Sequence, residues 1–194
     1  MKNFFILFFV VSNSYAQSNP IKYYNPFSFA KVYNINPNNL DAFVNAFYYD
    51  FYKNTDQFKN KDFVKIYINV FNSLNTEIYF KEINESQMKE DSNVLAVAWG
   101  MFDNCKVSIQ VNPNTWQKAD NVRRLWILYH ELAHDVFNIE HGQGGPLMDS
   151  EIPPFIDEVK FLNAKDILVR YVSKNNLYPK CSTKFSELDS LLKN

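Results

Sequence analysis

The order of patterns along the 194-residue chain predicts an α+β fold. A helical pattern of apolar residues comes first, alternating apolar and polar residues typical of strands follow, and two longer helical patterns occupy the second half. The composition allows a packed core, because 46% of the residues are hydrophobic and 17% are aromatic. With only 4 Gly and 8 Pro, the chain is neither collagen-like nor linker-like.

The charge of the chain argues against nucleic acid as a partner. Lys and Arg number 20 and Asp and Glu 21, so the formal net charge is −1. A protein that binds nucleic acid through bulk attraction to phosphates carries a basic surface or a basic run. The sequence has no such run, and we expect no nucleic-acid partner.

Residues 1–16 are typical of a cleaved signal peptide. Lys2 supplies the positive start, residues 4–11 form an apolar run, and Ser14-Tyr15-Ala16 places small residues where signal peptidase recognises them. A membrane anchor is the alternative, but the run is far shorter than the about 20 residues that a span requires. We therefore expect a secreted or periplasmic protein with no membrane span, whose mature chain, residues 17–194, is one domain.

The first part of the mature chain contains one predicted helix. Residues 17–36, rich in Asn and Tyr, are expected to form an extended segment or a short pro-segment. A helix of about 20 residues is predicted from Pro37, because Asn36 suits the N-cap and Pro suits the first helical position. Apolar residues recur there at helical spacing: Leu40, Phe43, Val44, Phe47 and Phe51.

Strand-like patterns follow this helix. The predicted strands cover residues 64–70, 76–83, 94–102 and 105–111, with a polar loop at 84–93. Asp103-Asn104 suits a tight turn that would pair the last two strands as a hairpin.

Helical patterns dominate the second half of the chain. Asn112-Pro113 predicts the start of a long helix, which has a core stripe of Leu125, Leu128, Leu132 and Val136. Further helices are predicted at 155–173 and 185–192. Between the long helix and the helix at 155–173, three of the four glycines cluster: Gly142, Gly144 and Gly145.

The sequence holds two cysteines, Cys105 and Cys181. In an exported protein they could form a disulfide, and two free thiols are the alternative. The sequence has no CxxC pattern, so a cysteine-based zinc site is not supported.

All three histidines lie between positions 130 and 141. His130 and His134 belong to an HExxH motif, which places them one turn apart on one helix face, where both can bind one metal ion. Glu131 lies beside them and is the candidate general base for a water molecule activated by zinc. Solvated surface side chains are the alternative, and the apolar back of this helix favours the metal site.

A catalytic zinc takes three protein ligands and keeps one position open. In a continuous helix His141 would lie about 10 Å beyond His134 along the axis, so the chain must turn. Asn138 is the predicted pivot, because Asn tolerates the left-handed conformation that ends helices. Glu140 is the alternative third ligand if the chain turns earlier.

The stretch from His130 to His141 resembles the metzincin clan of zinc metallopeptidases, whose consensus is HExxHxxGxxH followed by a turn that contains methionine. Phe137 replaces the glycine of that consensus and Glu140 replaces its third histidine. Asn138 and His141 restore the spacing one residue later.

Residues 145–149 (GPLMD) are similar to the methionine turn of that clan. Met148 would be the structural methionine below the metal, and an ordinary core methionine is the alternative. A ligand arrangement similar to that of thermolysin would instead use a glutamate on a later helix, such as Glu158.

The resemblance covers residues 94–150. It implies a twisted mixed sheet with two long helices in an N-terminal lobe, residues 17–141, and a small, mostly helical C-terminal lobe, residues 142–194. It also implies that an edge strand before the active-site helix aligns an extended peptide, and residues 105–111 are the candidate strand.

The resemblance further implies zinc held by His130, His134 and His141, with Glu131 as catalytic base and Met148 as structural methionine. The expected function is that of a secreted zinc-dependent metallopeptidase that hydrolyses peptide bonds in a peptide or protein substrate. The alternative is a non-catalytic secreted module with a structural or decayed zinc site.

The positions of three further polar residues indicate their roles. Asp135 is expected to be a cap or part of a buried network. Arg123 and Arg124 are expected to be solvated, with Arg123 facing the active-site cleft as an alternative. Loops such as 84–93 and 142–155 are expected to form the walls of that cleft.

Overall fold

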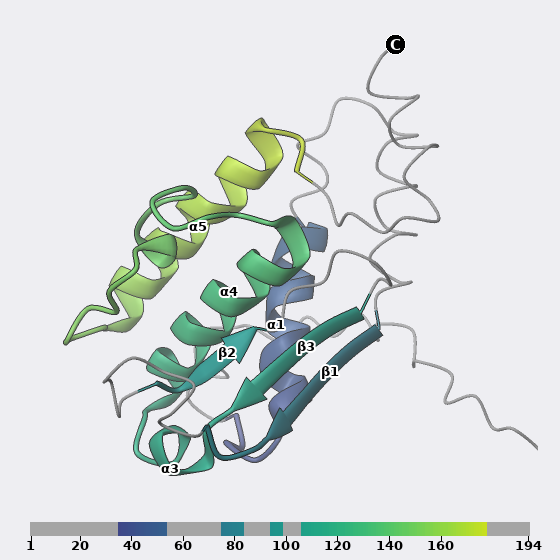
Figure 1. The fold of residues 1–194 in the computed structure, drawn as a ribbon. Coiled ribbons are helices and arrows are strands. Elements are labelled where there is room, and N and C mark those ends of the chain that lie inside the picture. The colour runs from purple at the N-terminus through teal and green to yellow at the C-terminus, as the bar shows by residue number, and fades with distance from the viewer. Residues whose placement is uncertain (1–34, 54–74, 84–93, 99–105, 178–194) are drawn as a thin grey trace, which may run out of the picture.

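The computed structural model describes residues 35–53, 75–83, 94–98 and 106–177. Helices and a small mixed sheet make up this part of the chain, which is compatible with the predicted α+β class. None of the described helices is long and apolar enough to cross a membrane. The elements, drawn in Figure 1, are α1 (Leu40–Lys53), β1 (Asn75–Phe80), β2 (Ala96–Ala98), β3 (Lys106–Val111), α3 (Pro113–Trp116), α4 (Asn121–Phe137), the short 3-10 helix η4 (Pro146–Met148) and α5 (Glu158–Lys174).

Several expectations concern residues outside the described ranges. They are the signal peptide at 1–16, most of the segment 17–36, the strand at 64–70, the loop at 84–93, the turn at 103–104, both cysteines (Cys105 and Cys181) and the helix at 185–192.

The sheet has the strand order β1-β3-β2. β1 runs parallel to β3, with Asn75 opposite Lys106 and Phe80 opposite Val111. β2 runs antiparallel to β3, from Ala96 opposite Val111 to Ala98 opposite Ile109. The expectation that residues 105–111 form the edge strand is wrong, because β3 pairs with a strand on each side. Among the described strands, β2 is the edge strand that packs on α4.

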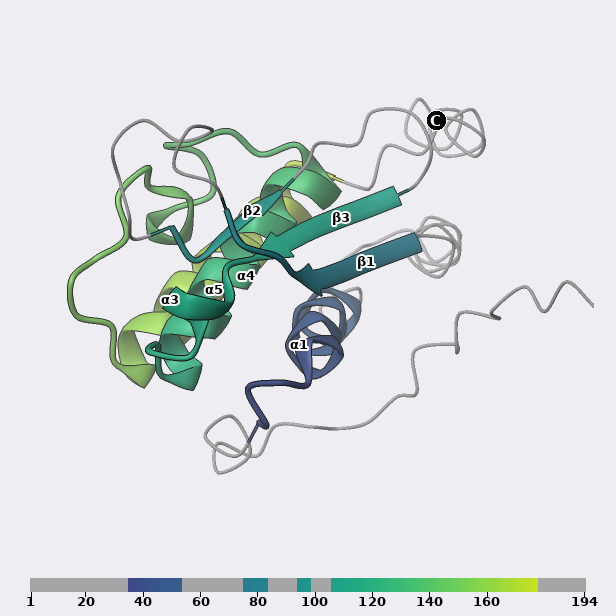
Figure 2. The same cartoon turned by 60° about the horizontal axis from the view of Figure 1, so that its bottom comes forward.

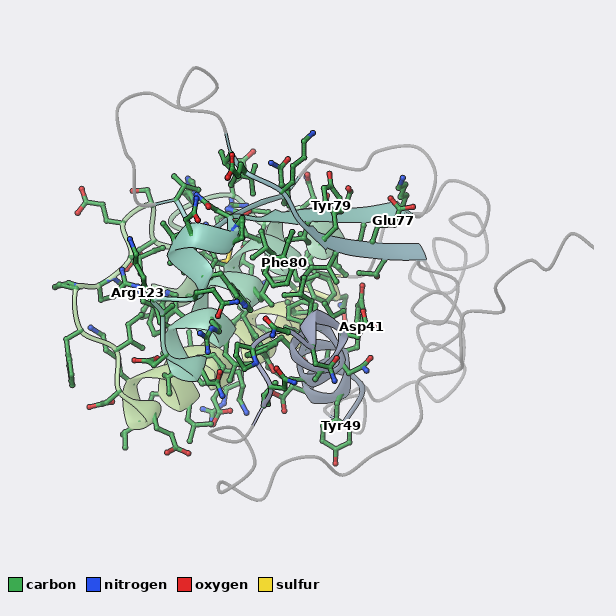
Figure 3. All side chains as sticks on the ribbon, turned by 90° about the horizontal axis from the view of Figure 1, so that it is seen from below. Asp41, Tyr49, Glu77, Tyr79, Phe80 and Arg123 are labelled. Carbon is green, nitrogen blue, oxygen red and sulfur yellow. The ribbon has the colours of Figure 1, made fainter. Side chains whose placement is uncertain are left out.

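The helices cover one face of the sheet, as Figure 2 shows. α4 packs against β2 and β3, α1 packs against β1 and α4, and α5 packs against α4 and η4. Side chains of β1 alternate accordingly, because successive residues of a strand point to opposite faces. Ile78 is half-buried in the core, whereas Glu77 and Tyr79 are exposed (Figure 3).

Aromatic rings join α1 to the elements around it. Phe43, Phe47 and Phe51 recur every four residues and are buried on the inner face of α1. Phe47 meets the ring of Tyr129 on α4 at 5.2 Å, and Phe43 meets Trp116 on α3 at 5.2 Å. Asp41 and Tyr49 lie on the outer side of the same helix (Figure 3). The predicted apolar stripe of this helix is therefore confirmed.

α1 begins three residues later than predicted. The side-chain oxygen of Asn36 accepts from the amide of Asn38 at 3.0 Å, and its carbonyl accepts from the amide of Asn39 at 2.9 Å. These bonds close a turn around Pro37. Asn39 then caps the helix, because its side chain accepts from the amide of Ala42 at 3.2 Å.

The single helix predicted from residue 112 is wrong, because two helices occupy this region. Asn112 caps only α3, by accepting from the amide of Asn114 at 3.1 Å. Asp120 caps α4, by accepting from the amide of Arg123 at 2.7 Å. The second cap starts a new helix after a break at residues 117–120.

Arg124 is buried, so the expectation that it is solvated is wrong. Its guanidinium donates to the carbonyl of Trp116 at 3.1 Å and to the side-chain oxygen of Asn121 at 2.7 Å. It also lies 5.5 Å from the ring centre of Trp116. Arg124 thus satisfies the carbonyl end of α3 and fixes the break between the two helices.

α5 and β1 differ from the predicted helix at 155–173 and the predicted strand at 76–83 only at their ends. α5 begins at Glu158 rather than at 155, because Asp157 caps it by accepting from the amide of Lys160 at 2.7 Å. β1 ends at Phe80 rather than at residue 83.

Candidate metal centre

The centre is built on the last turns of α4 and on the loop that follows. α4 ends at Phe137, and Asn138 adopts the left-handed conformation with φ 55° and ψ 43°. The amides of Asn138 and Ile139 donate to the carbonyls of His134 and Ala133, at 3.0 and 3.3 Å. These bonds reverse the chain direction at the end of the helix, as in other left-handed helix caps. The predicted pivot at Asn138 is confirmed.

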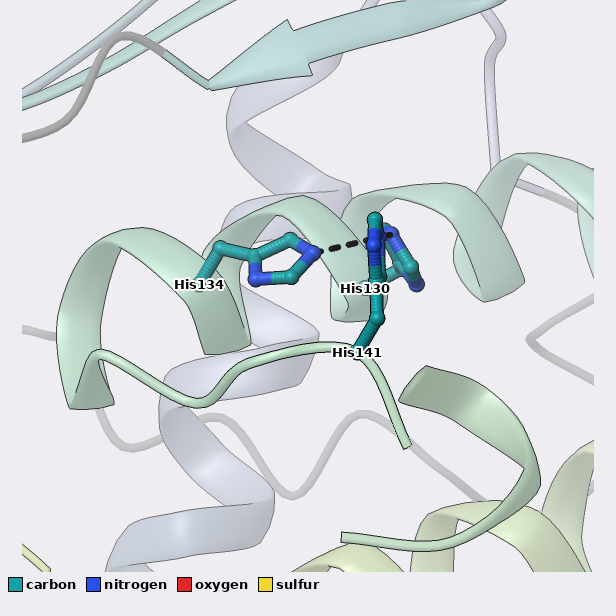
Figure 4. Close-up of side chains that lie close together, drawn as sticks. All are labelled: His130, His134 and His141. Carbon is teal, nitrogen blue, oxygen red and sulfur yellow. Dashed lines mark hydrogen bonds between the residues drawn. The ribbon is translucent and has the colours of Figure 1, made fainter. Parts of the chain in front are cut away.

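The reversal brings the three histidines together, as Figure 4 shows. The Nε2 atoms of His130 and His134 lie 3.0 Å apart, and those of His130 and His141 lie 3.2 Å apart. All three potential ligand atoms lie within 4.8 Å of one another. His130 is buried, His134 is half-buried and His141 is exposed, so the group is reached from one side.

Backbone carbonyls orient two of the three rings. The Nδ1 atom of His130 donates to the carbonyl of Leu147 at 2.6 Å, and that of His134 donates to the carbonyl of Ile139 at 2.5 Å. A carbonyl oxygen can only accept, so the proton of each neutral ring resides on Nδ1. The Nε2 atoms of both rings therefore present lone pairs to the centre, as metal-binding histidines do.

The two inner histidines stay neutral at ordinary pH. Burial lowers the pKa of His130 to about 4, although its bond to Leu147 opposes the effect. Burial also lowers the pKa of His134 below its usual range, and the neighbouring His141 adds to this effect. Neutral imidazole is the form that binds metal.

The spacing of the nitrogens fits a metal ion. Ligands at the usual zinc–nitrogen distance of 2.0–2.1 Å in tetrahedral geometry lie about 3.3 Å from one another. The separations of 3.0 and 3.2 Å are close to this value. Without a cation, the Nε2 lone pairs of His130 and His134 repel each other, because the ring protons of both residues reside on Nδ1. The group could thus hold a metal ion, and imidazole ligands suit several transition metals.

Glu131 lies next to the first histidine and faces the sheet. Its Oε2 accepts from the amide of Ala98 on β2 at 2.8 Å. Burial raises its pKa to about 7, while the bond to Ala98 opposes the rise. A carboxylate with a pKa near neutrality can both accept and release a proton, which suits a general base and acid.

η4 and the glycines before it form the turn that packs beside the histidine group. Leu147 and Met148 are fully buried, and the carbonyl of Met148 accepts from the amide of Gly142 at 2.9 Å. Gly145 has a φ of 89°, and a Cβ atom there would overlap the side chain of Ile167 on α5. This position therefore requires glycine, which allows η4 to pack closely on α5.

The other candidate ligands do not join the cluster. Among the described residues, the group of possible ligands contains the three histidines and neither Glu140 nor Glu158. Glu140 is exposed beyond the pivot, and its amide donates to the side chain of Gln143. The turn at Asn138 presents the residue three positions later, which is His141.

The assigned polar residues have separate roles. Asp135 is buried, and its Oδ2 accepts from the amide of Ser108 at 3.0 Å, so the predicted network position is confirmed. Arg123 donates to the carbonyl of Pro154 at 3.4 Å (Figure 3 labels it). The arginine thus ties α4 to the segment before α5.

A cavity of about 620 Å³ opens beside His141. Its remaining lining comes from the turn after the helix and from the segment after η4, namely Gly142, Asp149, Ser150, Glu151, Ile152, Pro153 and Pro154. The 142–155 loop thus lines a cavity at the exposed member of the histidine group, and its role as a wall of an active-site cleft stays a prediction.

Sequence reasoning missed the backbone groups of the site. The carbonyls of Leu147 and Ile139 and the amide of Ala98 carry no side-chain signature, and nothing in the sequence pattern identifies them. The sequence did indicate that Asp135 and Glu131 share one face of the helix, because they lie four residues apart.

Comparisons with known proteins leave the site as the basis for any functional assignment. No protein-family model matches the chain, and no curated protein or solved structure matches it.

Proposed function

We propose that this protein is an exported zinc metallopeptidase of metzincin type. The observation that carries the proposal is the convergence of the Nε2 atoms of His130, His134 and His141 within 4.8 Å, with two of the rings held by carbonyls. Three histidines with a carboxylate beside them form the ligand pattern of a catalytic rather than a structural zinc site.

Several features support the metzincin assignment over other zinc peptidases. The third ligand follows a left-handed pivot, and the buried Met148 lies in the turn next to Leu147, whose carbonyl orients His130. A thermolysin-like arrangement would require a carboxylate from a later helix, and Glu158 lies outside the ligand group.

In the proposed reaction zinc, when bound, lowers the pKa of a water molecule and polarises the scissile carbonyl. Glu131 takes the proton from the water molecule as its oxygen forms a bond to the carbonyl carbon. The same carboxyl group then gives a proton to the amine as the C–N bond breaks. The amide of Ala98 binds one carboxylate oxygen of Glu131, and the other oxygen would serve the proposed proton transfer.

The substrate is proposed to lie along β2 rather than β3. β2 is the edge of the described sheet next to Glu131, and an extended peptide can add to an exposed strand edge through backbone hydrogen bonds. The cavity beside His141 would then receive a side chain of that peptide.

The test combines metal content with activity on purified residues 17–194. We expect about one zinc per chain in the wild type and in Glu140→Ala, and loss of zinc in His141→Ala. Glu131→Gln should retain zinc and lose cleavage of a peptide library by about 10²-fold or more.

Two outcomes would contradict the proposal. A wild type without zinc after refolding in its presence would exclude the metal site. Zinc with no peptide cleavage, and no effect of Glu131→Gln on any activity, would leave the alternative of a non-catalytic module with a structural zinc.

A further inference from the structure

Two carboxylates on α4 face the sheet together. Glu131 and Asp135 lie four residues apart, and therefore on the same side of the helix. Each carboxylate accepts a hydrogen bond from a backbone amide of the sheet: Glu131 from Ala98 at 2.8 Å and Asp135 from Ser108 at 3.0 Å. His130 and His134, two of the three histidines of the metal cluster, are also four residues apart, one position earlier on the helix.

The two amides belong to neighbouring positions of paired strands. Ala98 on β2 lies opposite Ile109 on β3, and Ser108 directly precedes Ile109. The carboxylates thus attach adjacent turns of α4 to two adjacent strands. Two attachments of this kind fix both the distance of the helix from the sheet and its rotation about its axis.

The burial of Asp135 costs free energy, because a carboxylate is removed from water to join the helix to a strand. Its side chain is buried, with 8% of its surface exposed. In the described part of the chain its Oδ1 has no hydrogen-bond partner. A buried carboxylate loses its hydration, and the one amide that binds it satisfies only one of its two oxygens. Its presence is better explained by a requirement for position than by stability.

We propose that Asp135 is a positioning residue for Glu131. By binding the amide of Ser108, Asp135 sets the rotation of α4 at which Glu131 reaches the amide of Ala98 and the edge of β2. A catalytic group that is misplaced by about 1 Å can lose about 10²-fold in rate. The inference rests on the proposed function for the role of Glu131 as base, while the positioning itself is a property of the chain.

The test uses Asp135→Ala, Asp135→Asn and a matched control. Asp135→Ala removes the acceptor, whereas Asp135→Asn keeps an oxygen that can accept from Ser108. The control is Tyr129→Phe, which removes another side-chain hydrogen bond of α4, from Tyr129 to Asp50 on α1 at 2.6 Å. This bond leads away from the sheet.

The first readout is amide hydrogen exchange in the metal-loaded protein, followed by NMR. In Asp135→Ala we expect the Ala98 amide to exchange about 10-fold faster, although Asp135 binds the amide of Ser108 and Ala98 binds Glu131. Asp135→Asn and Tyr129→Phe should leave this amide protected. A purely local role of Asp135 would change the exchange of Ser108 alone, and that result would overturn the proposal.

The second readout is the split between kcat and KM in peptide cleavage. Asp135→Ala should lower kcat by about 10- to 100-fold with little change in KM and in zinc content, and Asp135→Asn should recover most of the loss. If Asp135→Ala does not fold, Asp135→Glu replaces it, because its longer side chain keeps the charge but shifts the helix. A kcat for Asp135→Glu equal to that of Asp135→Asn would overturn the proposal. If the wild type cleaves no peptide, the proposed function fails, and the exchange experiment still decides the role of Asp135.

Discussion

The Nδ1 atom of His130 lies 2.6 Å from the carbonyl oxygen of Leu147, the residue directly before Met148. A ring on α4 is therefore oriented by the backbone of η4, the short helix that contains the methionine. Since the acceptor is a main-chain atom, no replacement of the Leu147 side chain removes it. Only a change in the path of the chain through this turn can do so.

Gly145→Ala should disturb that path. Gly145 has a φ of 89°, and an added Cβ would overlap the side chain of Ile167, so η4 or α5 must shift. We expect a loss of about 1–3 kcal/mol in the free energy of unfolding and a metal affinity about 10-fold weaker. Urea unfolding and competition with a coloured chelator measure the two effects. Gly142→Ala is the control, because its φ is also positive but a Cβ there meets no atom within 4 Å. Equal metal affinity in both variants would contradict the role of the turn.

Replacement of the pivot should separate backbone conformation from side-chain chemistry. Asn138 has a φ of 55°, a region that glycine adopts freely and β-branched residues avoid. Asn138→Gly is expected to retain metal binding, whereas Asn138→Val should destabilise the fold by about 1–2 kcal/mol and weaken metal binding. Thermal unfolding with and without metal measures both. If Asn138→Gly loses the metal as fully as Asn138→Val, the Asn side chain rather than the left-handed turn is what matters.

Removal of metal should lower the stability of the wild type but not of a ligand variant. An ion that binds only the folded chain stabilises it by about 4 kcal/mol at a thousand times its dissociation constant. We expect a chelator to lower the melting temperature of the wild type and to leave that of His134→Ala unchanged. Zinc added back should restore only the wild type. A chelator effect of equal size in both proteins would place the stabilising metal elsewhere.

The pH dependence of stability should change in Glu131→Gln. Burial raises the pKa of Glu131 from 4.5 to about 7, so the folded chain binds more protons there than the unfolded chain, and stability falls as pH rises through this window. His130 acts in the opposite sense, because burial lowers its pKa from 6.5 to about 4 and stability falls as pH drops from 6.5 toward 4. The two effects oppose each other in the wild type.

In metal-free Glu131→Gln the effect of Glu131 on the pH dependence of stability is removed, and the opposing effect of His130 remains. Its stability should therefore rise more steeply with pH between 4.5 and 6.5, by on the order of 1 kcal/mol per pH unit relative to the wild type. Urea unfolding of chelator-treated protein at pH 5, 6 and 7 measures the slopes. Parallel slopes for the two proteins would show that Glu131 is solvated rather than buried.

The parts of the fold that depend on local sequence were predictable. The αL pivot at Asn138 and the position of His141 follow from the conformational tolerance of Asn and from the reach of one turn. The aromatic stripe of α1 follows from apolar spacing. The antiparallel pairing of β2 with β3 follows from the short turn sequence Asp103-Asn104 between two strand-like patterns.

The parts of the fold that depend on a choice between nearby helix caps, or on contacts between residues distant in the sequence, were not predictable. Asn36 and Pro37 predicted the helix start, whereas the side chain of Asn39 forms the cap that begins the helix. The buried Arg124 depends on carbonyls left free at the end of α3, which a sequence pattern does not reveal. β3 lies inside the sheet because a parallel strand joins it, and a pattern of alternating residues carries no information about neighbours.

The site is assembled from contacts of very different sequence separation. His130 and the carbonyl of Leu147 are 17 residues apart, whereas Glu131 and Ala98 are 33 residues apart. A twofold longer loop costs only about 0.6 kcal/mol more to close, so the two contacts differ chiefly in the segments that they join. The three histidines and the carbonyls of Ile139 and Leu147 all lie in the segment 130–147, so these groups of the metal centre are present even in a chain whose β2 is undocked. On the proposed chemistry, a chain in that state holds metal but has no aligned base, so partly folded copies would not cleave one another.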